Sequence, residues 1–76
     1  MKEKVTRFIV DELLNGLNVG EQDDLLLSGL LDSMSVMRLV AFIEEEAALR
    51  VPPEDVIIEH FVNIESIARY LEERGA

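Results

Sequence analysis

The sequence has no cysteine and no tryptophan, and it contains one histidine, His60, among its 76 residues. The absence of cysteine excludes disulfides, thiol nucleophiles and cysteine zinc sites. A lone histidine with no partner nucleophile leaves no acid–base pair, and the sequence has no glycine-rich phosphate loop. We therefore expect neither an enzyme nor a metal site, with His60 at the surface or in an interface. Any reactive group would have to be attached to the chain.

The charge balance is strongly acidic, with 16 Asp and Glu against 7 Lys and Arg and a formal net charge of −9. Such a balance repels nucleic acid and anionic membranes and favours partners with basic surfaces. Hydrophobic residues make up 49% of the chain, too many for a disordered acidic tail. No apolar run approaches the roughly 20 residues of a membrane span, and the start of the chain lacks an apolar signal core. We expect one monomeric, cytoplasmic domain over residues 1–76 that binds no nucleic acid and enters no membrane.

Apolar residues recur at helical spacing in three segments of the chain. The first stripe starts at Val5, and its helix should end near Asn15-Gly16. The strongest pattern runs from Ser33 to Leu49, with Asp32 or Ser33 as the capping residue. This helix should stop at Val51-Pro52-Pro53, because a residue before proline is pushed toward extended geometry.

Beyond the prolines, the pattern predicts a short turn over residues 54–56 and one or two helical turns over 57–61. Asn63 is the expected N-cap of a last helix, which should end at Gly75. No segment alternates between apolar and polar residues as a strand would. The chain is therefore predicted to be all-α: a small four-helix bundle with three main helices and a short third one.

A long loop, residues 15–32, connects the first two predicted helices. Its acidic run, residues 21–24, lacks the alternating ligands, central glycine and terminal glutamate of a calcium loop, so we interpret it as a solvated turn. The leucines at 25–27 and 30–31 do not suit a solvated loop. We expect them to pin the loop against the helices, since a connection of this length is unusual unless it packs or functions.

Ser33 stands next to Asp32 where this loop becomes a helix. One interpretation is a helix cap and nothing more, since serine is common at helix starts. The other is a modified hydroxyl, because the free N–H groups and the dipole of a helix start favour a phosphate. Asp32 could then hold a metal ion or a basic partner group during phosphoryl transfer. The neighbours would make the surface around Ser33 partly apolar: Leu30, Leu31, Met34 and Met37.

The run Ser28-Gly29-Leu30-Leu31-Asp32-Ser33-Met34 resembles the modification motif of acyl carrier proteins. In that family, the serine of an Asp-Ser-Leu/Met triplet carries 4′-phosphopantetheine. The triplet alone is a weak signal, but here it lies at a helix start in a short acidic four-helix pattern. The resemblance covers nearly the whole chain, including its length, its acidity and the long first loop. It also includes Glu44-Glu45-Glu46, Val51-Pro52-Pro53 and Ile67-Ala68-Arg69-Tyr70-Leu71.

The resemblance implies that a phosphopantetheinyl transferase attaches the arm from coenzyme A to Ser33. Acyl or aminoacyl groups would then travel on the arm as thioesters. Pathway enzymes with a basic docking surface, such as a loading ligase, a synthase or a transferase, would bind the helix that follows Ser33. Exposed ion pairs are individually weak, so this docking should be transient and salt-sensitive. The positions implied for partner contact are Met34, Met37, Arg38, Ala41, Glu44 and Glu45.

Two departures from the carriers of fatty acid biosynthesis bear on the pathway. Arg38 stands where those carriers usually have an acidic residue, and the stretch from Val51 to Val62 is longer than theirs. The Ser-Gly-Leu-Leu-Asp-Ser-Met and Pro-Pro-Glu-Asp patterns also look more like stand-alone carriers of specialised pathways. We therefore favour a D-alanyl, aminoacyl or polyketide carrier over a fatty acid synthesis carrier.

An alternative function is a non-carrier acidic adaptor that binds basic proteins through the same helix. Such an adaptor would be insensitive to loss of the Ser33 hydroxyl. Ser35 is a rival hydroxyl, but its side chain is expected to point elsewhere. Phe42 is expected at the edge of the core rather than in a ligand pocket. The second and last helices could part to admit an acyl chain, although ordinary packing explains their small residues equally well.

Overall fold

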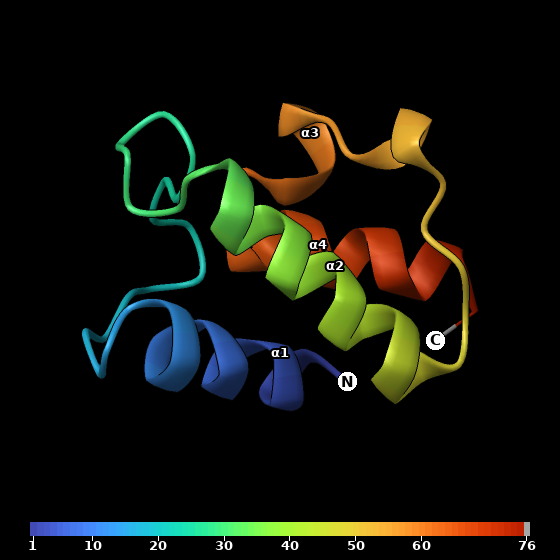
Figure 1. Ribbon diagram of the computed structural model, residues 1–76, viewed down its shortest axis with the longest axis horizontal. Coiled ribbons are helices and arrows are strands. Elements are labelled where there is room, and N and C mark those ends of the chain that lie inside the picture. Colours follow the sequence, from blue (N-terminus) through green and yellow to red (C-terminus); the bar gives the residue numbers. More distant parts are fainter. Residues whose placement is uncertain (76) are drawn as a thin grey trace.

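The computed structural model describes residues 1–75, which form four α-helices and no strand (Figure 1). They are α1 (Lys2–Phe8), α2 (Ser33–Ala47), α3 (Ile58–Phe61) and α4 (Ile64–Glu73). A π-helical turn, Ile9–Leu13, extends α1, and a 3₁₀ turn, Pro53–Asp55, precedes α3. The predicted all-α bundle with a short third helix and a long loop before α2 is confirmed. None of these helices combines the length and apolarity that a bilayer crossing requires.

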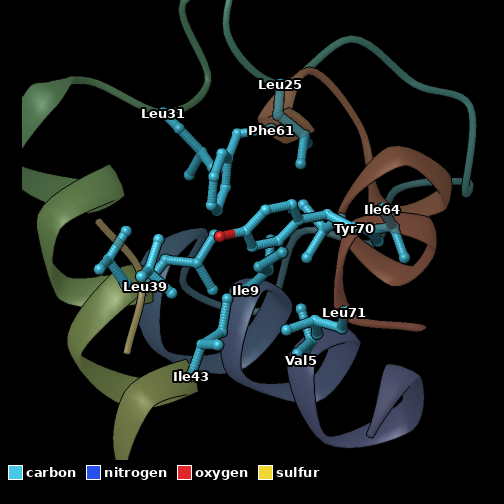
Figure 2. Close-up of a cluster of buried hydrophobic side chains, with 13 residues drawn as sticks. Val5, Ile9, Leu25, Leu31, Leu39, Ile43, Phe61, Ile64, Tyr70 and Leu71 are labelled. Atoms are coloured by element: carbon cyan, nitrogen blue, oxygen red, sulfur yellow. The ribbon is translucent and has the colours of Figure 1, made fainter. Parts of the chain in front are cut away.

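One apolar core joins α1, α2, α4, the long loop and α3 (Figure 2). Val5 reaches it from α1, Ile9 from the π-helical turn, and Leu39 and Ile43 from α2, all within the segments where apolar residues recur at helical spacing. Burial of such side chains is the main term that stabilises a domain of this size. The buried side chains are Val5, Ile9, Leu25, Leu31, Leu39, Val40, Ile43, Val51, Phe61, Ile64, Ile67, Tyr70 and Leu71.

The helical segment made of α1 and its π-helical turn ends at Leu13, just before the stop predicted near Asn15 and Gly16. Both have left-handed backbone conformations, with φ of 53° and 91°. The N–H of Leu14 donates to the carbonyl of Ile9 at 2.9 Å, five residues back, which is the π-helical spacing. Phe8 is half-buried and stacks on Phe42 of α2, with ring centroids 4.2 Å apart. This contact confirms Phe42 at the edge of the core.

The long loop is fastened to the bundle by two of its leucines. Leu25 and Leu31 are buried, and the Leu25 N–H donates to the carbonyl of Val62 at 2.7 Å. Leu27 and Leu30 are exposed instead, so the expectation that all the loop leucines pack is wrong for these two. Leu27 points outward because the Asp24 carboxylate accepts the backbone N–H groups of residues 26 and 27, which closes a tight turn.

In the second half of the chain, the helix ends, the proline turn and the helix cap lie close to their predicted positions. α2 ends at Ala47, two residues before the expected end, because Ala48 adopts a left-handed conformation with φ of 52°. Pro53 then opens the 3₁₀ turn, where its fixed φ and missing N–H are tolerated. Asn63 caps α4 as predicted, since its side-chain oxygen accepts the backbone N–H of Ser66 at 2.7 Å.

Candidate functional site

Ser33 is the first residue of α2, and its side chain is exposed. The cap of this helix is Asp32, whose Oδ1 accepts the backbone N–H of Ser35 at 2.8 Å. The two capping candidates in the sequence are therefore separated: Asp32 caps the helix, and the Ser33 hydroxyl is left for another role. A helix start also presents N–H groups without intrahelical partners, and these suit an anion bound at Ser33.

The capping contacts set the charge of Asp32. The hydrogen bond from the Ser35 N–H, assisted by the Ser35 hydroxyl, holds the pKa of the Asp32 carboxyl below its ordinary value. Asp32 is therefore ionised at neutral pH and places a fixed negative charge beside the Ser33 hydroxyl. Ser35 itself is half-buried, and its contacts belong to the cap.

An apolar groove of about 460 Å³ opens beside Ser33. Asp32 and Ser33 are its polar lining residues, and the loop, α2 and the stretch from Val56 to Phe61 provide its walls. A mostly apolar lining with a few polar groups is the usual composition of a small-molecule site. The apolar residues that line it are Leu26, Leu31, Val36, Met37, Val56, Ile57, Ile58 and Phe61.

The exposed large hydrophobic side chains are concentrated around this groove. With the exception of Leu17, each of them either lines the groove or is the sequence neighbour of a residue that lines it. Met34 and Met37, expected at a partner surface, are 75% and 65% exposed. A cluster of exposed apolar side chains on a small domain usually marks an interaction site. We call this set the apolar collar: Leu27, Leu30, Met34, Met37, Ile57 and Ile58.

The sequence reasoning missed three members of the apolar collar, namely Leu27, Ile57 and Ile58. No local signal marks the isoleucines, because consecutive apolar residues of a helix can both be buried, as Leu39 and Val40 are. None marks Leu27 either, because the same leucine run supplies both buried and exposed residues.

The residues of α2 that were expected to meet partners fall into two groups. Arg38, Ala41 and Glu45 are exposed, like the two methionines. Glu44 is half-buried, and its Oε2 accepts the backbone N–H of Val51 at 2.9 Å. Arg38 takes part in none of the ion pairs formed within residues 1–75, so its guanidinium is available to a partner.

His60 lies outside the site, in a contact internal to the molecule. The ring is half-buried on α3, with its Nδ1 2.8 Å from the carbonyl oxygen of Asp55 and its face packed on Tyr70. His60 therefore occupies an intramolecular packing position between α3 and α4, rather than the surface or partner-interface position that the sequence suggested.

Comparisons with known proteins agree with this geometry. A family model described as "Phosphopantetheine attachment site" matches residues 3–71. Among solved structures, a chain from one described as "Crystal structure of FAD-dependent dehydrogenase" is similar at 30% sequence identity and a TM-score of 0.80. That match covers 88% of this chain and 97% of the other. No curated protein matches the sequence.

The family match spans most of the chain, including the Asp32-Ser33 pair, α2 and most of α4. Members of this family carry 4′-phosphopantetheine and are served by a phosphopantetheinyl transferase and by the enzymes of their pathways. The resemblance seen in the sequence is therefore confirmed, and the chain belongs to the phosphopantetheine attachment site family of carrier proteins.

Proposed function

We propose that Ser33 is the attachment point for the 4′-phosphopantetheine arm. The observation that carries this proposal is the division of roles at the start of α2: Asp32 caps the helix, while the exposed hydroxyl of Ser33 is free to be modified. The residues present fit the arm. Unpartnered N–H groups of the helix start suit a phosphate, and the apolar groove beside Ser33 suits an uncharged chain. When attached, the arm supplies the thiol that carries acyl groups as thioesters.

The residues around Ser33 would then prepare it for its enzymes. Ionised Asp32 attracts a basic side chain or a metal ion of the phosphopantetheinyl transferase to the hydroxyl. The apolar collar gives each partner a contact area centred on the arm, and its methionines repack readily against different surfaces. Arg38, Ala41, Glu44 and Glu45 continue this partner face along α2, with the half-buried Glu44 contributing only through its remaining oxygen.

We propose further that the cargo is an acyl or aminoacyl group of a specialised pathway, handled by a single cytoplasmic, monomeric carrier domain. A flavin-dependent dehydrogenase is one candidate partner, because the similar solved chain comes from a structure described as that of such an enzyme. In that role the carrier would present a saturated acyl or aminoacyl thioester for oxidation. Loading ligases and transferases of the same pathway would share the partner face.

The second candidate function is the non-carrier adaptor. It rests on the same apolar collar and acidic surface, since both would serve a basic protein partner without any arm. The adaptor differs from the carrier in one respect: it makes no use of the Ser33 hydroxyl.

Incubation with coenzyme A, Mg²⁺ and a broad-specificity phosphopantetheinyl transferase, followed by intact mass measurement, separates the two functions. The carrier gains one phosphopantetheine group, Ser33→Ala gains none, and Ser35→Ala, which keeps the capping N–H, gains it as the parent does. Circular dichroism of each variant checks that the helices remain. No gain in the parent, with a known carrier modified alongside, would favour the adaptor.

A further inference from the structure

The shortest helix of the bundle forms one wall of the groove beside Ser33. Ile57 and Ile58, at its start, are 40% and 52% exposed, and Phe61 at its end is buried. A helix of four residues is not stable alone, because the cost of nucleation exceeds what one turn returns. The position of α3 must therefore be set by contacts with the rest of the molecule.

Asp55, in the 3₁₀ turn before α3, makes hydrogen bonds with both its side chain and its backbone. Its Oδ2 accepts the hydroxyl of Tyr70 of α4 at 2.7 Å and lies 3.6 Å from a guanidinium nitrogen of Arg74. Its carbonyl oxygen accepts the backbone N–H of Ile57 at 2.9 Å and lies 2.8 Å from Nδ1 of His60. One residue thus connects the beginning of α3, the body of α3 and the end of α4.

Tyr70 completes the connection with its ring. The ring contacts those of His60 and Phe61, with centroid distances of 4.7 and 5.9 Å, and Figure 2 shows Tyr70 beside Phe61. Burial and the adjacent Asp55 carboxylate raise the pKa of the Tyr70 hydroxyl to about 12, so it remains a donor at neutral pH. Tyr70 therefore holds α3 through both its face and its hydroxyl.

We propose that Asp55, His60 and Tyr70, the α3 clamp, are positioning residues for the partner face. They hold α3 against α4 so that Ile57 and Ile58 stay beside Ser33 as an ordered part of the apolar collar. The use of this surface rests on the carrier function proposed above, whereas the clamp itself exists in the chain without its arm. Partners then meet a preformed surface and do not lose affinity in ordering it.

Amide hydrogen exchange of the unmodified chain tests the clamp directly. Tyr70→Phe keeps the ring and removes the hydroxyl bond, and Arg69→Gln, on the exposed face of α4, is the matched control. In Tyr70→Phe, exchange at the amides of His60 and Phe61, which donate to the Ile57 carbonyl, should accelerate about tenfold, the effect of losing one ordinary hydrogen bond. The amides of α2 should change far less. A uniform change across all helices, or none, would overturn the proposal.

A second, functional experiment uses the double variant Tyr70→Phe/His60→Ala, which weakens the contacts that hold α3 further. The KM of the transferase for this variant should rise at least about threefold, with kcat within about a factor of two, because fewer chains present an ordered surface. A fall in kcat at unchanged KM, or no change in either, would overturn the positioning role. If the parent chain accepts no phosphopantetheine arm, the proposed function fails. Amide hydrogen exchange in α3 then tests by itself whether the clamp residues hold that helix.

Discussion

The side-chain carboxylate of Glu44 accepts a hydrogen bond from the backbone N–H of Val51, across the end of α2. Val51 is buried, and the chain between the two residues turns through the left-handed Ala48. Glu44 thus anchors the segment that leads from α2 toward α3. The resemblance to acyl carrier proteins implies the same docking role for Glu44 and Glu45, whereas the structure gives Glu44 an internal contact and leaves Glu45 exposed.

Charge reversal at these two neighbours should therefore give different results. Glu44→Lys leaves the N–H of buried Val51 without its acceptor, so the free energy of unfolding should fall by about 1–3 kcal/mol. Glu45→Lys, on the exposed surface, should change it by no more than about 0.5 kcal/mol. Urea unfolding measures both, and Glu44→Gln, which retains an acceptor oxygen, is the control. Equal stabilities for the two lysine variants would contradict the anchoring role.

Glu45→Lys is consequently the cleaner probe of docking. Its rate of loading by a basic transferase should fall, and the dependence of that rate on salt should flatten, because one attractive charge becomes repulsive. The measurement is the rate of phosphopantetheine transfer across a series of salt concentrations. Glu73→Lys, at the exposed end of α4, changes the net charge equally and should have a weaker effect. Equal slowing by both would assign the effect to net charge rather than to docking at α2.

Arg38 should act as a selector among partners. It is exposed and forms no ion pair within residues 1–75, so a partner that recognises it would place a carboxylate opposite. Arg38→Glu should then weaken partners of that kind while strengthening partners with basic surfaces. Loading rates measured for the parent and the variant with two or more partner enzymes give the order in which each chain prefers its partners. An unchanged ranking would show that Arg38 is only a solvated side chain.

The loop leucines offer a matched pair for separating stability from docking. Leu25 is fully buried, so Leu25→Ala should cost about 2–5 kcal/mol in the free energy of unfolding. Leu27 is 72% exposed in the same run, so Leu27→Ala should leave stability within about 0.5 kcal/mol. We expect Leu27→Ala to raise the KM of the transferase instead. Similar unfolding energies for the two would contradict the burial pattern of the loop.

Much of the fold could be predicted from local patterns, because helical spacing, caps and prolines act over a few residues. The stripe through Val5 and Ile9, the Asn63 cap and the turn at Pro53 are examples. Contacts that depend on tertiary placement could not be predicted. The outward turn of Leu27 is set by the Asp24 carboxylate, and the position of His60 by a ring on another helix.

In the candidate site, too, local features could be predicted and features that depend on tertiary contacts could not. Ser33 and Asp32 could be found from the motif, since adjacent residues and a helix start define it. The groove beside Ser33 could not, because its walls come from three separate segments of the chain. Its isoleucines are brought to the site by contacts of Asp55 and Tyr70, which are fifteen positions apart in sequence.

The Asp32 cap predicts how the stability of α2 depends on pH. The folded-state pKa of Asp32 is lowered relative to the ordinary value of 3.8, so the folded state favours the ionised form. The resulting stabilisation is fully present above the unfolded-state pKa and is lost as the pH falls through the lowered folded-state value. Asp32→Asn retains a capping oxygen for the Ser35 N–H but has no charge to titrate. The stability difference between the parent and this variant should therefore be constant near neutral pH and shrink in acid.

Chemical unfolding of both proteins between about pH 3 and 7 measures that difference, and the other carboxylates cancel because the two chains share them. The amide resonance of Ser35 provides a local readout, since its N–H donates to the Asp32 carboxylate. In the parent it should shift with a midpoint below 3.8, and in Asp32→Asn that shift should be absent. Parallel loss of stability in both proteins would show that the charge of Asp32 does not support the helix. Asp32 would then have no ionised capping role beside Ser33, and its charge would be available only to partners.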